Sequence, residues 1–367
     1  MLKKFSVENF KSFQNKFVLD LSKPGNYAFN QDCVRNEVVD KAAIYGINGI
    51  GKSNLGLAIF DIVNNLTDKI KLLSKYENFI NFDSKQKYAL FEYEFDFDGD
   101  GVIYRYRKSG VNDLIEETLW INEKKMLEYN YVSHTGFSYF PGSETLNLEN
   151  ESPNSRVKYI MDTAILKADS QENMILNKFK SFVNRMLLFY SLRENNFIGY
   201  KDRTSTLDNM IINAGKVKEF EDFINSQGLN IRLTVVESPE GKKLYFKYKN
   251  GLAHYFQECS TGMISLILIF AWMLEISNCS FVFIDEFDAF YHYELAEKII
   301  KELKKYTKTQ IIVTTHNTDL MNNDLMRPDC YFVLTDEKID SLNRLTEKDL
   351  RFAHNLQKMF KAGAFNE

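Results

Sequence analysis

The sequence predicts an α/β fold with a mixed β-sheet core, an N-terminal antiparallel β subdomain and an inserted helical lid. Residues 38–45 form an apolar strand pattern that runs into a Gly-rich turn, and apolar residues then recur at helical spacing over 53–70. From Cys259 onward, short apolar strands alternate with helices, as in buried parallel sheets. Alternating residues over 3–20 and around 91–106 predict antiparallel hairpins.

These elements divide the chain of 367 residues into three parts. Residues 1–150 form an N-terminal lobe that holds the Gly-rich turn and the hairpins. Residues 151–250 are expected to be an inserted, mostly helical lid, which ends in a hairpin around Pro239-Glu240-Gly241. Residues 251–367 form a C-terminal lobe, whose expected strands are Phe281–Ile284, Gln310–Thr314 and Tyr331–Leu334.

Composition and charge limit the classes of function. The formal net charge of −4 argues against a protein that coats nucleic acid by bulk charge, although it leaves room for a local basic patch. The 4 cysteines show no metal-binding spacing and are typical of reduced thiols. The N-terminus lacks the apolar stretch of a signal peptide, and the longest apolar run, Met263–Ile276, is too short to span a bilayer. We therefore expect a cytoplasmic protein.

The Gly-rich turn carries a phosphate-binding motif. It reads Gly46-Ile47-Asn48-Gly49-Ile50-Gly51-Lys52-Ser53, which fits G-x-x-x-x-G-K-[ST] between a strand and a helix. Backbone N–H groups of such a loop and the dipole of the following helix hold an anion. Lys52 is expected to reach the β- and γ-phosphates of ATP and Ser53 to bind Mg²⁺, and the nucleotide-binding residues are Asn48, Gly49, Gly51, Lys52, Ser53 and Asn54.

A second acidic motif follows an apolar strand. Asp285 and Glu286 end the strand Phe281–Ile284. Two carboxylates at the end of a buried strand need a compensating role. Asp285 would hold Mg²⁺ and Glu286 would activate the attacking water. The alternative is that both acids cap the next helix, with Asp288 as its N-cap.

The order of the motifs resembles the ABC ATPase superfamily. Between the two motifs lies Ser260-Thr261-Gly262-Met263 before an apolar helix, and Thr314-Thr315-His316-Asn317 follows a later strand. The resemblance implies that Ser260 and Gly262 form the signature that binds the γ-phosphate held by the opposite subunit. It also implies that His316 contacts the γ-phosphate and that Asp288 crosses the dimer interface. The alternatives are an ordinary helix cap at Ser260 and a structural His316; His292 is expected to be structural.

Further stretches are similar to one branch of this superfamily. Residues 8–13, Glu-Asn-Phe-Lys-Ser-Phe, resemble the opening box of SMC, RecF and OLD proteins, which sits beside the nucleotide. Only 233 residues separate Lys52 from Asp285 (285 − 52), and no sustained heptads for long coiled-coil arms occur between them. Residues 327–333 and 348–364 resemble ATP-binding proteins of the abortive-infection AbiL and RloA type. The glutamine loop of the superfamily is hard to place, with Gln86 as a candidate.

The resemblance implies an ATP-switched dimer that senses infection and controls a separate effector in bacterial anti-phage defence. The 51 residues after His316 are too few for the nuclease domain of OLD proteins (367 − 316), so we expect a partner to carry the damaging activity. A RecF-like DNA-binding ATPase is the second hypothesis, with basic residues at 178–185 and 301–308 as candidate contacts. A transporter ATPase is the third, and the opening box speaks against it.

Overall fold

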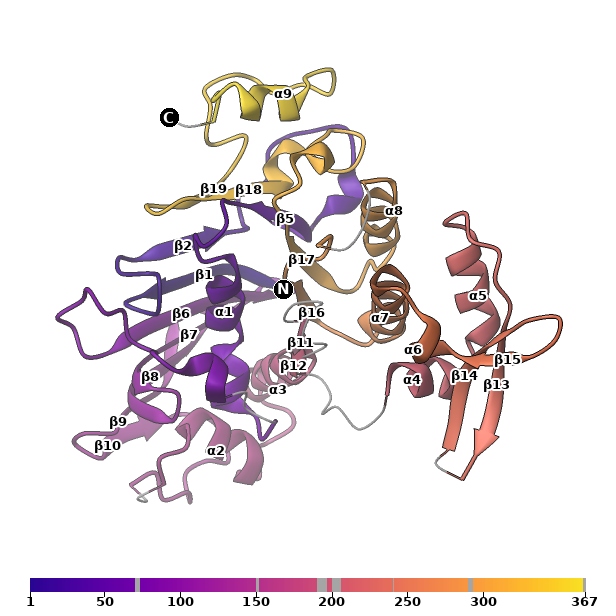
Figure 1. The fold of residues 1–367 in the computed structure, drawn as a ribbon. Coiled ribbons are helices and arrows are strands. Elements are labelled where there is room, and N and C mark those ends of the chain that lie inside the picture. Colours follow the sequence, from indigo (N-terminus) through magenta and orange to yellow (C-terminus); the bar gives the residue numbers. More distant parts are fainter. Residues whose placement is uncertain are drawn as a thin grey trace.

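The computed structural model of this protein describes residues 1–69, 73–149, 152–189, 197–199, 206–239, 241–289 and 293–365. An antiparallel sheet of seven strands forms one side of the molecule, with the order β10-β9-β8-β7-β6-β1-β2 (Figure 1). It confirms both N-terminal hairpins, β1–β2 and β6–β7. Its strands are β1 (Leu2–Glu8), β2 (Phe17–Asp20), β6 (Ala89–Phe97), β7 (Asp100–Gly110), β8 (Asp113–Ile121), β9 (Lys124–Asn130) and β10 (Thr135–Ser138).

A second sheet of seven strands is mixed and forms the core, with the order β12-β11-β16-β17-β5-β18-β19. Its five inner strands are parallel, and β12 and β19 pair antiparallel at its edges. The three strands expected in the C-terminal lobe are confirmed at their predicted bounds. The strands are β5 (Lys41–Tyr45), β11 (Met186–Phe189), β12 (Phe197–Gly199), β16 (Phe281–Ile284), β17 (Gln310–Thr314), β18 (Tyr331–Leu334) and β19 (Ile339–Ser341).

Helix α1 (Lys52–Leu66) lies between the two sheets. On one side, Gly56 packs so close to β16 that a Cβ there would lie 2.8 Å from the ring of Phe283. On the other side, the Tyr93 hydroxyl donates to the Ala58 carbonyl at 2.9 Å. The helix ends four residues before the predicted Ile70, because Thr67 is extended and its hydroxyl donates to the Val63 carbonyl at 2.7 Å.

The region predicted as a helical lid, 151–250, is not one unit in the structure. Helices α2 (Arg156–Thr163) and α3 (Gln171–Asn184) pack beside α1 and the antiparallel sheet. Strand β11 then enters the core sheet, where Leu188 is paired with Phe283 of β16. The boundaries therefore need correction: the insertion proper begins after β12, and its sheet makes it only partly helical.

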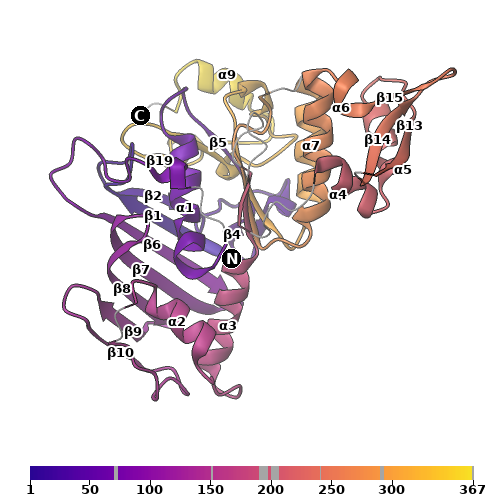
Figure 2. The same ribbon diagram turned by 60° about the horizontal axis from the view of Figure 1, so that its bottom comes forward.

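The insertion proper packs on one long helix, α7 (Thr261–Ile276), and lies on the side of α7 away from the core sheet (Figures 1 and 2). Its core joins Phe220 and Ile224 to Phe246 and to Ile267 of α7. It confirms the predicted hairpin and adds a third strand. Its elements are α4 (Leu207–Asn213), α5 (Val217–Asn225), β13 (Leu233–Ser238), β14 (Gly241–Lys247), β15 (Leu252–His254) and α6 (Tyr255–Glu258).

The remaining elements complete the C-terminal lobe and the connections. Helix α8 (Tyr293–Lys304) covers the core sheet beside α7, and α9 (Leu356–Lys361) lies near the carboxyl end of β18 (Figure 1). His292 lies outside the described residues. No helix in the described part of the chain is long and apolar enough to cross a membrane. The short elements are β3 (Val34–Arg35), β4 (Val38–Val39) and four 3-10 turns at Gln31–Cys33, Leu73–Tyr76, Thr318–Leu320 and Pro328–Cys330.

Candidate nucleotide site

The loop between β5 and α1 has the close packing that its glycines allow. A Cβ on Gly46 would lie 2.9 Å from the Leu334 carbonyl oxygen of β18. Gly51 has a φ of 116°, and a Cβ there would lie 2.5 Å from the Ser12 hydroxyl. Both positions therefore exclude larger side chains. Ser12 also accepts a hydrogen bond from the Asn54 amide at 3.0 Å, so the opening box at 8–13 does lie beside this loop.

The loop offers donors to an anion. The N–H groups of Asn48, Gly49 and Gly51 donate to no acceptor within the described residues. The Lys52 ammonium is buried and donates to the carbonyls of Gly46 at 2.8 Å and Ile47 at 3.2 Å. Burial lowers the pKa of Lys52, and the carboxylates of Glu286 and Asp285 oppose that shift. Phosphate oxygens would satisfy the free N–H groups and replace the two carbonyls around Lys52.

The phosphate loop and the acidic motif meet at the carboxyl edge of the core sheet. The Ser53 hydroxyl donates to Asp285 Oδ2 at 2.5 Å, and the Thr314 hydroxyl donates to Asp285 Oδ1 at 2.7 Å. Burial raises the pKa of Asp285, while these two hydrogen bonds lower it. A hydroxyl and a carboxylate side by side are oxygen ligands that suit Mg²⁺. Ser53 and Asp285 are thus the residues that fit the ion.

Glu286 adopts a strained conformation at the end of β16. Its φ is 50°, in the left-handed region that non-glycine residues rarely occupy. Its N–H donates to the Thr314 hydroxyl at 2.8 Å, which holds the turn, and its side chain is half-buried. Such strain costs about 1–3 kcal/mol and is concentrated at functional sites. The turn after β16 therefore favours the catalytic interpretation of this acid over a helix cap.

His316 follows β17, the strand paired with β5, and lies beside the phosphate loop. It is exposed, and it lines a cavity of about 470 Å³ together with Gly46, Ile47 and Ile50. The structure therefore brings His316 beside the loop, as its predicted role at the γ-phosphate requires. Ile47, at 75% exposed, adds an apolar side chain to the same open edge.

Ser260 and Gly262 lie elsewhere, at the N-terminus of α7. Ser260 is exposed and its hydroxyl accepts from the Met263 N–H at 3.4 Å, so the side chain does serve as the helix cap. Gly262 is exposed as well, and a Cβ there would lie 3.9 Å from the Ser260 hydroxyl. No described contact joins either residue to Lys52 or Asp285 of the same chain.

Two further candidates occupy positions that differ from their predicted roles. Asp288 is buried, and its Oδ2 accepts from the Thr315 hydroxyl at 2.8 Å while its Oδ1 has no partner among the described residues. It therefore neither caps α8 nor projects toward a second subunit in this state. Gln86 accepts through its backbone carbonyl from the Asn9 amide at 2.9 Å, before β6. No described contact links its side chain to the phosphate loop.

A family profile described as "AAA domain, putative AbiEii toxin, Type IV TA system" matches residues 41–322, well over half of the chain. The chain belongs to this family. It is an ATPase domain of AAA/ABC type, and the matched range runs from β5 and the phosphate loop past His316.

Solved structures of SMC heads have a similar fold. The SMC head bound to the C-terminal winged-helix domain of ScpA is 16% identical, with a TM-score of 0.51 over 93% of this chain and 97% of that one. The SMC head domain of Thermotoga maritima is 19% identical, with a TM-score of 0.43 over 90% and 94%. The head from Pyrococcus furiosus is 18% identical, with a TM-score of 0.44 over 94% and 97%. No curated protein gives a significant match.

Sequence reasoning gave Thr314 no role in this AAA-domain site and placed Ser12 only as part of the opening box at 8–13. Thr314 links Asp285 to the backbone of Glu286, and Ser12 packs against Gly51 and Asn54. A hydroxyl that ends the apolar strand β17 was a usable signal for Thr314. The contacts of Ser12 with Gly51 and Asn54 could not be predicted from the box alone, because they depend on how the β1–β2 hairpin packs against the phosphate loop.

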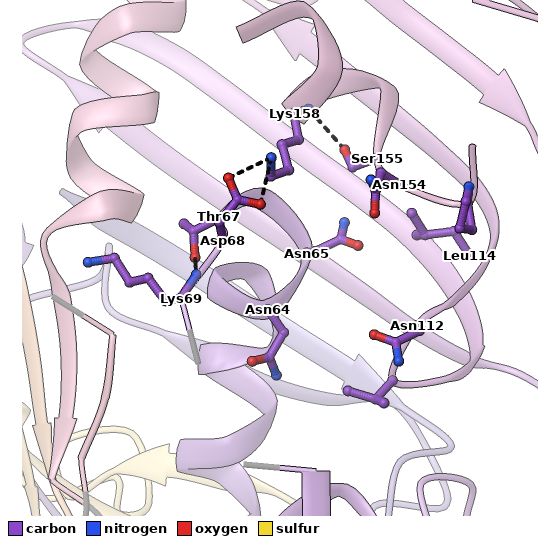
Figure 3. Close-up of a pocket in the computed structure, with 12 residues that line it drawn as sticks. Asn64, Asn65, Thr67, Asp68, Lys69, Asn112, Leu114, Asn154, Ser155 and Lys158 are labelled. Atoms are coloured by element: carbon purple, nitrogen blue, oxygen red, sulfur yellow. Dashed lines mark hydrogen bonds and ion pairs between the residues drawn. The ribbon is translucent and has the colours of Figure 1, made fainter. Parts of the chain in front are cut away.

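A second cavity lies at the far end of α1, away from the nucleotide site of the AAA domain. Its volume is about 490 Å³, and its lining includes Asn64, Asn65 and Asn154. Figure 3 shows Lys158 paired with Asp68 at its rim, at 3.1 Å. None of the predicted site residues lines it.

The buried Asp285 carboxylate is expected to lower the stability of the nucleotide-free ATPase domain. Its folded-state pKa lies above the ordinary 3.8, so stability falls as pH rises from that value through the raised pKa. Asp285→Asn should therefore stabilise the free protein at neutral pH, by roughly 1.4 kcal/mol for each unit of raised pKa. The gain should shrink in acid, where the wild-type carboxyl is protonated. Thermal unfolding across pH measures it, and a variant less stable at neutral pH would contradict it.

Proposed function

We propose that this chain binds ATP with Mg²⁺ and hydrolyses ATP as a homodimer. The observation that carries the proposal is the hydrogen-bonded chain Ser53–Asp285–Thr314–Glu286, which joins the phosphate loop to the candidate base. In this series of hydrogen bonds, two oxygens that could bind a cation lie beside the carboxylate of Glu286, which is held in a strained turn. A helix cap would need neither the oxygen pair nor the strained turn.

Each residue has a part in this proposal. The N–H groups of the loop and Lys52 hold the phosphates, with Asn48, Gly49 and Gly51 around them. Mg²⁺, held by Ser53 and Asp285, would offset the charge on the phosphate oxygens. Glu286 orients a water for attack on the γ-phosphate, and His316 contacts that phosphate.

The proposed dimer completes each site with a second copy. Ser260 and Gly262 sit at the exposed N-terminus of a 16-residue helix, which carries a positive dipole end. Because they do not meet the phosphate loop of their own chain, the γ-phosphate would join the two copies. ATP would then favour the closed dimer, since only that state makes both sets of contacts. Asp288 would act at this interface after leaving Thr315.

We further propose that the dimer is the sensor or regulator of a bacterial anti-phage system of the AbiL or RloA kind, acting in the cytoplasm on a separate effector. The family description, which names a toxin–antitoxin system, supports a role of this class. The effector would carry the nuclease or toxin activity. Co-purification of the chain with its native partners tests this part, and recovery without any partner under conditions of ATP binding would count against it.

Ser260→Arg separates the dimer from simple ATP binding. The arginine adds bulk where the signature would meet the partner's nucleotide, so ATP-dependent dimers and Mg²⁺-dependent phosphate release should both be lost. ATP binding by the monomer should persist, because Ser260 does not touch its own phosphate loop. Light scattering and phosphate release measure the two effects. ATP hydrolysis by Ser260→Arg at the wild-type rate would contradict a site shared between two copies.

A further inference from the structure

The three-stranded sheet of the insertion has one covered and one open face. On β14, Leu244 and Phe246 are 0% and 4% exposed and pack against the helices of the insertion and α7. The residues between them point the other way, because successive side chains of a strand alternate. Lys243, Tyr245 and Lys247 therefore lie on the open face.

The strand register adds side chains from both neighbouring strands to the open face. Tyr245 is paired with Thr234 of β13 and with His254 of β15. The rings of Tyr245 and His254 meet edge to face, with centroids 5.1 Å apart. The Lys247 N–H donates to the Arg232 carbonyl at 2.8 Å, which continues the pairing by one residue. The described residues of this face are Arg232, Thr234, Val236, Lys243, Tyr245, Lys247, Leu252 and His254.

This open face combines aromatic rings with positive charge. It carries Arg232, Lys243 and Lys247 and no acidic residue among the described ones. The nearest glutamate on β13, Glu237, is paired with Lys242 at the end of the hairpin and belongs to the opposite side of the register.

Several lysines of the other two basic stretches pair with neighbouring acids. Lys178 lies 3.5 Å from Asp98. Lys301 of α8 lies 2.5 Å from Glu297, and Lys305, just after α8, lies 2.5 Å from Glu302. These lysines of 178–185 and 301–308 thus lie beside acids, whereas the open face of β13–β15 carries no acidic residue among its described side chains and is the better candidate for contact with a polyanion.

We propose that the open face of β13–β15 binds single-stranded nucleic acid. Unpaired bases stack on exposed aromatic rings, and flanking Lys and Arg side chains neutralise the phosphates between them. A duplex hides its bases and offers nothing for Tyr245 to stack on. The sheet lies on the side of α7 away from the core sheet, so this contact lies apart from the phosphate loop (Figures 1 and 2).

The test uses the full chain and a fluorescein-labelled oligothymidylate of about 20 nucleotides, free or annealed to its complement. Fluorescence anisotropy should show tighter binding to the single strand. Three phosphate contacts predict a slope of about −2 for log affinity against log salt. Tyr245→Ala should weaken binding roughly 5- to 100-fold, and Tyr245→Phe should retain it. Lys247→Ala should reduce the slope by about 0.7.

Lys301→Ala is the matched control, because it removes a lysine that is paired on a different surface. It should leave the affinity unchanged, and all variants should bind ATP and melt as the wild type does. If Tyr245→Ala does not fold, the affinity and salt dependence of Lys247→Ala alone test the proposal, because Lys247 is exposed. The proposal is overturned by absent single-strand binding, by preference for the duplex, or by unchanged affinity in folded Tyr245→Ala and Lys247→Ala. Failure here would leave the ATPase proposal intact, since that rests on phosphate release.

Discussion

Glu286→Gln is expected to slow ATP hydrolysis by about 10²- to 10⁴-fold, the usual contribution of a general base. The amide keeps the size of the side chain but cannot accept the proton of the attacking water. The backbone turn should persist, because the Glu286 N–H still donates to Thr314. ATP should still bind, so ATP-bound dimers should accumulate. Phosphate release and light scattering with ATP measure the two outcomes.

Glu294→Gln is the matched control for this change. Glu294 lies in the first turn of α8 and is exposed, so its replacement makes the same change in charge without touching the site. Its turnover should equal that of the wild type. Normal turnover by the Glu286→Gln protein would contradict the mechanism.

Lys52→Ala is expected to weaken ATP binding by about 100-fold or more, because the ammonium is the cation nearest the proposed phosphate position. Its two hydrogen bonds to the carbonyls of Gly46 and Ile47 are lost as well, so the loop is held less rigidly. ATP should raise the melting temperature of the wild type and leave that of the variant unchanged.

Lys87→Ala serves as the control, since Lys87 is exposed before β6. It should show the same ATP-dependent rise in melting temperature as the wild type. Circular dichroism distinguishes lost binding from lost folding. A folded Lys52→Ala protein with unchanged ATP affinity would contradict the role of the phosphate loop in ATP binding.

The core strands could be predicted because their signals are local. β16, β17 and β18 are apolar runs bounded by polar residues, and the structure keeps their predicted bounds. The phosphate loop is also local, since its glycines and Lys52 act within eight consecutive residues. The same holds for Asp285, whose place at the end of β16 follows from the strand before it.

The rest depends on contacts between distant segments. β11 is only Met186–Phe189, four apolar residues directly after α3, and only its pairing with β16 makes it a strand of the core. The link from Thr314 to Asp285 requires β16 and β17 to be neighbours in register. The position of Asp288 could not be predicted from the sequence either, because its contact with Thr315 depends on the same pairing of β16 with β17.

The central claim is that each ATP site is shared between two copies of the chain. Mixing the Lys52→Ala protein with the Ser260→Arg protein tests it most directly, since each alone has two defective sites. A mixed dimer would contain one intact site, with Lys52 from one copy and Ser260 from the other. An equal mixture should recover about a quarter of wild-type phosphate release, because half of random two-fold dimers are mixed and each has one working site. A mixture as inactive as its separate components would contradict the shared site.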